Sequence, residues 1–176
     1  MHGLIFGGLR EFAEHRLGAE TAASIWAGRR FELDEAYDDA EFLAQLDRVR
    51  AAAGVTQVEI QRAFGSFTAQ NAFVRLFPDY YSANDGSIPF LLGIEEQIHD
   101  VVRATIPGAL PPKLHVRPLG ESGVLITYTS ERQLCDLLAG LAIGVAEHYG
   151  EEVDLEEIQC MRRGDPGCVF AVQRAG

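Results

Sequence analysis

His99 is the first residue of this sequence whose type and position predict chemistry. It lies in residues 90–102, where apolar side chains recur with helical spacing and leave the histidine at the edge of an apolar face. A neutral imidazole offers a nitrogen lone pair, so a histidine beside an apolar wall can ligate a metal, including the iron of a haem. The spacing alone fits equally well a histidine that is exposed or satisfied by a hydrogen bond.

A second group of polar residues, Tyr128, Ser130 and Arg132, follows a short apolar segment that predicts a strand. A long amphipathic helix is expected to begin near Ser130. In such a strand-to-helix turn, a phenol, a hydroxyl and a guanidinium can converge to clamp a carboxylate or a phosphate. The alternative is that Ser130 caps the helix and that Arg132 is a solvated residue of its first turn.

The three cysteines form a third candidate group. Cys160 and Cys168 flank an expected hairpin turn, Gly164–Gly167, and Cys135 lies early on the long helix. Because the N-terminus shows no signal peptide pattern, we do not expect a disulfide framework. The paired C-x-x-C spacing of common zinc sites is missing, and the alternative is that these thiols pack as small apolar side chains.

Composition narrows the function classes. The 176-residue sequence is 47% hydrophobic, which excludes a mainly disordered chain, and its net charge of −11 argues against nonspecific nucleic-acid binding. No apolar run approaches the length of a membrane span, so we expect a cytoplasmic protein. The excess of acidic residues fits either solubility or a partner with a basic surface. Walker, G-x-S-x-G and H-E-x-x-H motifs are absent, and we expect no enzyme activity.

The order of expected elements is helical first and mixed afterwards. We predict an α+β fold, with a helical N-terminal lobe at about 1–65 and a C-terminal lobe at about 66–176 built on an antiparallel sheet with helices. Residues 80–89 are expected to form a loop, and a connector rich in Pro and Gly spans 107–112. The expected helices are at about 3–27, 40–53, 56–64, 67–77, 90–106 and 131–149, and the expected strands at about 113–118, 123–129, 153–162 and 167–174.

Taken together, these features resemble a known family. The opening residues 1–7, the segments 37–42 and 76–80, and above all Y-x-S-x-R placed after His99, resemble H-NOX domains. These are haem nitric oxide/oxygen-binding (HNOB) domains, and the likeness is to the bacterial standalone form. The resemblance implies haem b as cofactor. By this resemblance, His99 would be the axial ligand of the haem iron. Tyr128, Ser130 and Arg132 would bind the haem propionates, and Ile5 and Pro118 would contact the haem ring.

The resemblance also implies a function. Such a protein would be a gas sensor that binds nitric oxide at a five-coordinate ferrous haem, with weakening of the bond to His99 shifting the two lobes. We expect no fused output domain, so the partner acted on in trans would be a histidine kinase or a cyclic-di-GMP enzyme. Relatives that hold oxygen stably carry a distal tyrosine where this sequence has Leu137, which favours nitric oxide over oxygen.

Some relatives also hold a structural zinc in the C-terminal lobe. The resemblance places Cys135, Cys160 and Cys168 in that arrangement, with Glu157 as a candidate fourth ligand. Two other functions remain open from the sequence. One is a haem-free or zinc-stabilised interaction or scaffold protein of the same fold, and the other is a metal-dependent enzyme that uses zinc at the cysteines.

Overall fold

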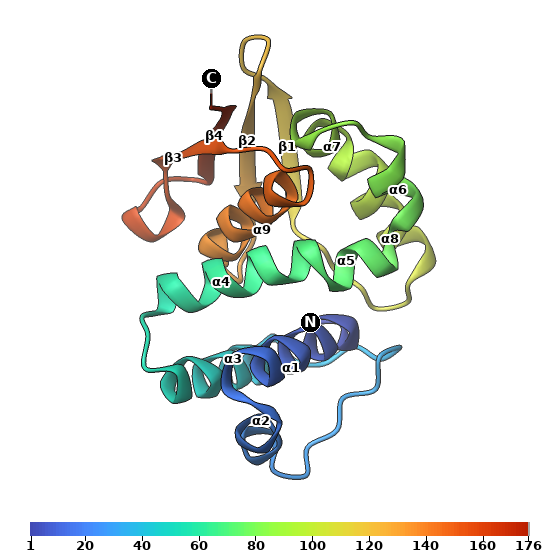
Figure 1. Ribbon diagram of the computed structural model, residues 1–176, viewed down its shortest axis with the longest axis vertical. Helices are drawn as coiled ribbons and strands as arrows, with labels where there is room; N and C mark the ends of the chain where they lie inside the picture. Colours follow the sequence, from blue (N-terminus) through green and yellow to red (C-terminus); the bar gives the residue numbers. More distant parts are fainter. Residues whose placement is uncertain (176) are drawn as a thin grey trace.

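The computed structural model describes residues 1–175, with a helical lobe at the N-terminus and a C-terminal lobe that contains a β-sheet (Figure 1). Among the described residues, no helix is both long and apolar enough to cross a membrane. The helices that precede the sheet are α1 (Gly3–Leu17), α2 (Ala19–Trp26), α3 (Asp39–Ala53), α4 (Gln57–Gln70), α5 (Ala72–Leu76), α6 (Pro78–Ala83), α7 (Ser87–Ile94) and α8 (Asp100–Thr105), the last two joined by a π-helical turn at Glu95–His99.

The sheet has four antiparallel strands in the order β1-β2-β4-β3. Helix α9 follows β2 and contacts β3 and β4, and a short 3-10 turn precedes β4. In β2, burial alternates with the period of two that strands impose, and Val124, Ile126 and Tyr128 are buried. The elements are β1 (Lys113–Pro118), β2 (Gly123–Thr129), α9 (Cys135–His148), β3 (Val153–Gln159), the turn Met161–Arg163 and β4 (Cys168–Arg174).

The buried apolar side chains form two clusters, one centred on each lobe, and Leu134 from the turn before α9 belongs to the N-terminal cluster. Helix α4 contributes to both, since Phe64 belongs to the N-terminal cluster and Ala69 to the C-terminal one. The expected lobe boundary near residue 65 therefore falls inside a continuous helix. We propose that the lobes meet along α4 rather than at a linker.

Close packing of α4 against α9 fixes how the lobes meet, as Figure 1 shows for the crossing of the two helices. A Cβ atom at Gly140 would lie 2.2 Å from the carbonyl oxygen of Arg62, and one at Gly144 would lie 2.5 Å from that of Ser66. Gly65 faces α9 in the same way, 2.4 Å from the carbonyl oxygen of Leu137. Only glycine lets the two backbones approach this closely.

The helical lobe differs from the sequence prediction at two points. The single helix expected over 3–27 is two helices, because Gly18 adopts φ 85° and ends the first of them. The break expected between residues 64 and 67 does not occur, since α4 continues through Gly65 and ends before Asn71. Gly65 lies inside this continuous helix, where it makes the close contact with α9.

The C-terminal lobe also differs from the prediction. The loop expected over 80–89 is wrong, because α6 and the start of α7 occupy most of it. Helix α5 ends at Leu76, before Pro78, and Pro78 itself opens α6 at the first helical position, where its missing N–H is not needed. Helix α9 begins at Cys135 rather than near 131, after a left-handed residue, Gln133, at φ 51°.

Candidate functional site

A cavity lies between the N-terminal helices and the sheet-containing lobe. Its walls are mostly Leu, Ile, Val, Phe and Ala side chains from α1, α4, α5, α7 to α9 and the connector that precedes β1. The space amounts to about 1340 Å³, counting its open mouth. A largely apolar cavity with a few polar groups is the usual form of a cofactor site.

His99 is one of two histidines in this cavity wall, and the other is His2 near the N-terminus. His99 ends the π-helical turn and its side chain is 14% exposed. Its Nδ1 lies 2.8 Å from Oε2 of Glu95. Burial lowers the pKa of His99 below its ordinary value, although the hydrogen bond to Glu95 acts in the opposite direction. Burial therefore favours the neutral ring, and Nδ1 is occupied by Glu95.

Tyr128, Ser130 and Arg132, the three residues of the predicted clamp, all line the cavity. The hydroxyl oxygen of Tyr128 accepts a hydrogen bond from the backbone N–H of Leu134 at 3.1 Å, and burial raises the pKa of this phenol. The hydroxyl oxygen of Ser130 accepts one from the N–H of Arg132 at 3.3 Å. Ser130 thus shapes the turn before α9 and does not cap the helix, which begins five residues later.

The guanidinium of Arg132 has two protein partners in the structure. Its Nε donates to Oδ2 of Asp39 at 2.7 Å, and its Nη1 donates to the carbonyl oxygen of Leu110 at 2.7 Å. The other oxygen of Asp39 lies 2.6 Å from the N-terminal ammonium of Met1. An arginine has five N–H donors, so Arg132 retains donors for an anionic group in the cavity.

Asp39 was not singled out from the sequence as a site residue. Burial alone would raise its pKa, but hydrogen bonds from the N-terminal ammonium and from Arg132 outweigh burial and hold the pKa below 3.8. The sequence placed Asp39 only in a segment resembling the family. Its partner Arg132 lies 93 residues away, and nothing in the local pattern of either segment pairs them.

The two residues expected to pack against the haem ring lie in different environments. Ile5 lines the cavity from α1. Pro118 does not, because it ends β1 and is exposed, away from the wall. The expectation for Pro118 is wrong, since the prolines that line the cavity are Pro111 and Pro112, in the connector before β1. From the sequence, these two were interpreted only as a stiff linker.

The wall formed by α9 and the residue preceding it carries aliphatic side chains at the expected register. Leu134, Leu137, Leu138 and Leu141 all line the cavity. Tyr81 lines it as well, but its hydroxyl donates to the carbonyl oxygen of Ala69 at 2.7 Å. The hydroxyl of Thr68 lacks a hydrogen-bond partner within residues 1–175, and its oxygen exposes less than 1 Å². That hydroxyl is therefore covered by its neighbours rather than presented to the cavity.

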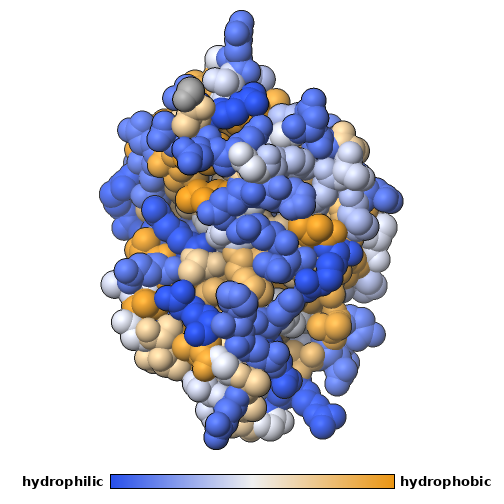
Figure 2. All heavy atoms as spheres, viewed as in Figure 1, coloured by the Kyte–Doolittle hydropathy of each residue, from blue (hydrophilic) through white to orange (hydrophobic). Residues whose placement is uncertain are grey.

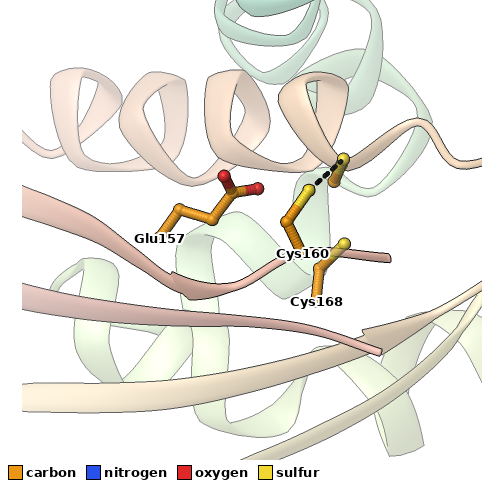
Figure 3. A group of neighbouring side chains, drawn as sticks. Glu157, Cys160 and Cys168 are labelled. Carbon is orange, nitrogen blue, oxygen red and sulfur yellow. Dashed lines mark hydrogen bonds between the residues drawn. The ribbon is translucent and has the colours of Figure 1, made fainter. Parts of the chain in front are cut away.

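The structure brings the three cysteines and Glu157 together in the C-terminal lobe. Figure 3 shows the side chains of Glu157 and Cys160 pointing toward α9, where Cys135 lies. One potential ligand atom from each of Cys135, Glu157, Cys160 and Cys168 lies within 4.8 Å of the others, and the sulfurs of Cys135 and Cys160 are 3.9 Å apart. The thiols are buried, and burial raises the pKa of Cys135 to about 12 and raises that of Cys168.

Comparison with known proteins identifies the class and then the family. The fold is that of solved H-NOX structures, a haem-based gas-sensing fold. An H-NOX protein from S. oneidensis in the Fe(II)NO state matches with a TM-score of 0.92, 21% identity and 100% coverage of both chains. An Fe(II) unliganded H-NOX protein from K. algicida matches with a TM-score of 0.82 and 21% identity, over 100% of this chain and 97% of that one.

A family model described as Haem-NO-binding matches residues 2–157. The chain belongs to this family, which confirms the resemblance and the α+β fold class predicted from the sequence. Comparison with curated protein sequences gives no match.

Proposed function

We propose that this protein binds haem b in the cavity and senses nitric oxide through it. The observation that carries the proposal is the position of His99 on a mostly apolar wall, with Nδ1 engaged by Glu95 and Nε2 left as the available lone pair. A haem supplies an iron that binds diatomic gases and needs an axial nitrogen. The residues present fit it, since they offer one axial donor, an apolar enclosure and a cationic edge.

The remaining roles follow from where each residue lies. Arg132 has the free N–H donors to bind the cofactor's carboxylates, with Ser130 and Tyr128 beside it. Ile5 and the connector residues Pro111 and Pro112 would contact the macrocycle. The division proposed above gives a helical lobe and a haem-enclosing lobe that share α4. The cavity then lies at the junction of these two lobes.

The preference for nitric oxide rests on the wall formed by α9. Bound oxygen needs a hydrogen-bond donor for its partly negative outer atom, whereas nitric oxide depends chiefly on its bond to iron. Leu137 cannot donate, and the hydroxyl of Tyr81 is committed to the carbonyl of Ala69. This wall therefore favours nitric oxide.

The experiment that tests the proposed function is the absorption spectrum of the purified ferrous protein. We expect a Soret band typical of a five-coordinate haem, unchanged in air and shifted by nitric oxide. A protein that purifies without haem and takes up none on reconstitution would favour the scaffold alternative.

Signalling would take place in trans and in the cytoplasm, with no catalysis by this domain. The support is family membership together with a net charge of −11, which suits a partner with a basic docking surface. Figure 2 shows a mainly hydrophilic face in which apolar side chains are interspersed. We propose a histidine kinase or a cyclic-di-GMP enzyme as the partner. The test is whether kinase or cyclase activity changes when the nitric oxide complex, but not the unliganded protein, is added.

A structural zinc at the cysteine cluster is a second proposal. It is favoured by the spacing of the four potential ligands and by Oε1 of Glu157, a buried oxygen with no hydrogen-bond partner among residues 1–175. Three thiolates and a carboxylate form a legitimate tetrahedral set. Elemental analysis of protein purified without added metal should find zinc near one equivalent, and Cys160→Ser should lose it. Substoichiometric zinc in the parent protein would mean that these four residues are packing residues and not zinc ligands.

A further inference from the structure

Glu95 makes a hydrogen bond to His99 that is part of a larger network. It opens the π-helical turn that His99 ends, and both of its carboxylate oxygens are engaged. Oε2 lies 2.8 Å from Nδ1 of His99 and also accepts from the backbone N–H of Leu114 at 3.1 Å. Oε1 accepts from the guanidinium of Arg103. With 23% of its side chain exposed, Glu95 is held in place from three directions.

The contacts of Glu95 decide which nitrogen of His99 carries the proton. An ionised carboxylate only accepts hydrogen bonds, so at 2.8 Å the Nδ1 of His99 must be the donor. In the neutral ring, Nε2 is then the unprotonated nitrogen and holds the lone pair. Glu95 therefore orients the imidazole for ligation.

A carboxylate on the far nitrogen also changes how strongly an imidazole donates to a metal. Such partners raise the basicity of the ligand. Arg103 moderates the effect at Glu95, because it neutralises the carboxylate and is itself held by Asp100 at 2.9 Å and by the carbonyl oxygen of Pro112 at 3.4 Å. The network thus runs from the connector that lines the cavity, through Arg103 and Glu95, to the ring of His99.

We propose that Glu95 is a positioning residue that strengthens the axial bond made by His99 and so sets how readily nitric oxide breaks it. The inference rests on the proposed haem function. A stronger axial bond opposes the loss of His99 on nitric oxide binding, so Glu95 tunes the threshold of the sensor. The π-helical turn supports a specialised role, since such turns occur frequently at functional sites.

The test compares Glu95→Gln and Glu95→Met with the parent protein and with Glu96→Met, a matched change at the exposed neighbouring glutamate. The readout is the iron–histidine stretching frequency of the ferrous protein by resonance Raman spectroscopy, which a merely structural role would leave unchanged. We expect the frequency to fall in Glu95→Gln and further in Glu95→Met, with Glu96→Met unchanged. Haem dissociation from Glu95→Met should accelerate by about 10- to 100-fold, the range typical of outer-shell partners.

A titration with nitric oxide completes the test. The share of protein that loses its bond to His99 should be larger in both Glu95 variants than in the parent. A parent protein with a normal iron–histidine band and Glu95 variants with the same frequency would overturn the inference while leaving the proposed function intact. A parent protein without haem, or without an iron–histidine band, would overturn both. Glu95→Gln, nearly isosteric, keeps the test decisive if Glu95→Met does not fold.

Discussion

Asp39, at the start of α3, accepts a hydrogen bond of 2.7 Å from Nε of Arg132 in the turn between β2 and α9. The arginine proposed to hold the cofactor's carboxylates is therefore the same one that ties the helical lobe to the sheet-containing lobe. An anionic group in the cavity that binds Arg132 would therefore also affect this ion pair between the lobes.

The first prediction separates these two roles of Arg132. Arg132→Ala should weaken haem retention by about 1.5–3 kcal/mol, the range for hydrogen bonds to charged groups, and Ser130→Ala by about 0.5–1.5 kcal/mol. Haem off-rates measured by transfer to an excess of a scavenger protein give both values. Asp39→Asn is the control, since it removes the negative charge of the tie but leaves the guanidinium. If Asp39→Asn loses haem as fast as Arg132→Ala, Arg132 serves only as the tie.

The second prediction concerns pH and Asp39. Because its pKa is lower in the folded protein than the ordinary 3.8, folding favours the ionised form. The stabilisation is then fully present above 3.8 and is lost as the pH falls through the lower folded-state pKa. Urea midpoints of the parent protein and of Asp39→Asn should differ at neutral pH and converge in acid. A gap that stays constant over this range would mean that Asp39 contributes nothing through its charge.

The third prediction tests the crossing of α4 and α9. Gly140→Ala should destabilise the protein by at least about 1–3 kcal/mol, the usual cost of overpacking, because its Cβ would lie 2.2 Å from a backbone oxygen of α4. Gly8→Ala is the matched control. Its Cβ would meet only ordinary contacts at 3.9 Å, and loss of a helical glycine should stabilise by about 0.5–1 kcal/mol. Chemical denaturation measures both, and equal effects would contradict the packing described here.

The fourth prediction concerns gas selectivity. Exposure of the ferrous protein to air should leave the spectrum of the unliganded form, because the wall at Leu137 has no donor. Leu137→Tyr should gain a stable oxygen complex, since a phenol at this position can donate a hydrogen bond. A stable oxygen complex in the parent protein would contradict this account, and Thr68→Val would then show whether the covered hydroxyl of Thr68 is responsible.

Local patterns predicted the strands well and some helix boundaries poorly. The expected bounds of β1 and β2 match the structure, because an alternating apolar pattern between Pro- and Gly-rich turns leaves little choice of register. The loop expected at 80–89 is wrong because Pro78, which follows the end of α5, also opens α6, and proline suits a first helical turn. The local sequence does not distinguish a proline that follows the end of one helix from a proline that begins the next.

Site residues that belong to a sequence motif could be predicted, whereas contacts that only the tertiary fold brings together could not. His99, Arg132 and the cysteines are the residue types that the chemistry requires, so they could be named in advance. Glu95 was missed although it lies only four residues before His99, a spacing that places both side chains on one helical face. That spacing was the available signal. Pairing Asp39 with Arg132 needs the tertiary fold.

The central claim is that His99 is the axial ligand of a haem in this cavity. The most direct measurement is the ferrous absorption spectrum of His99→Gly, purified with and without imidazole, beside His115→Gly as a control at an exposed histidine. We predict that His99→Gly loses haem or retains it only with added imidazole, which enters the space left by the side chain, and that His115→Gly matches the parent protein. An unchanged five-coordinate spectrum in His99→Gly without imidazole would contradict the claim.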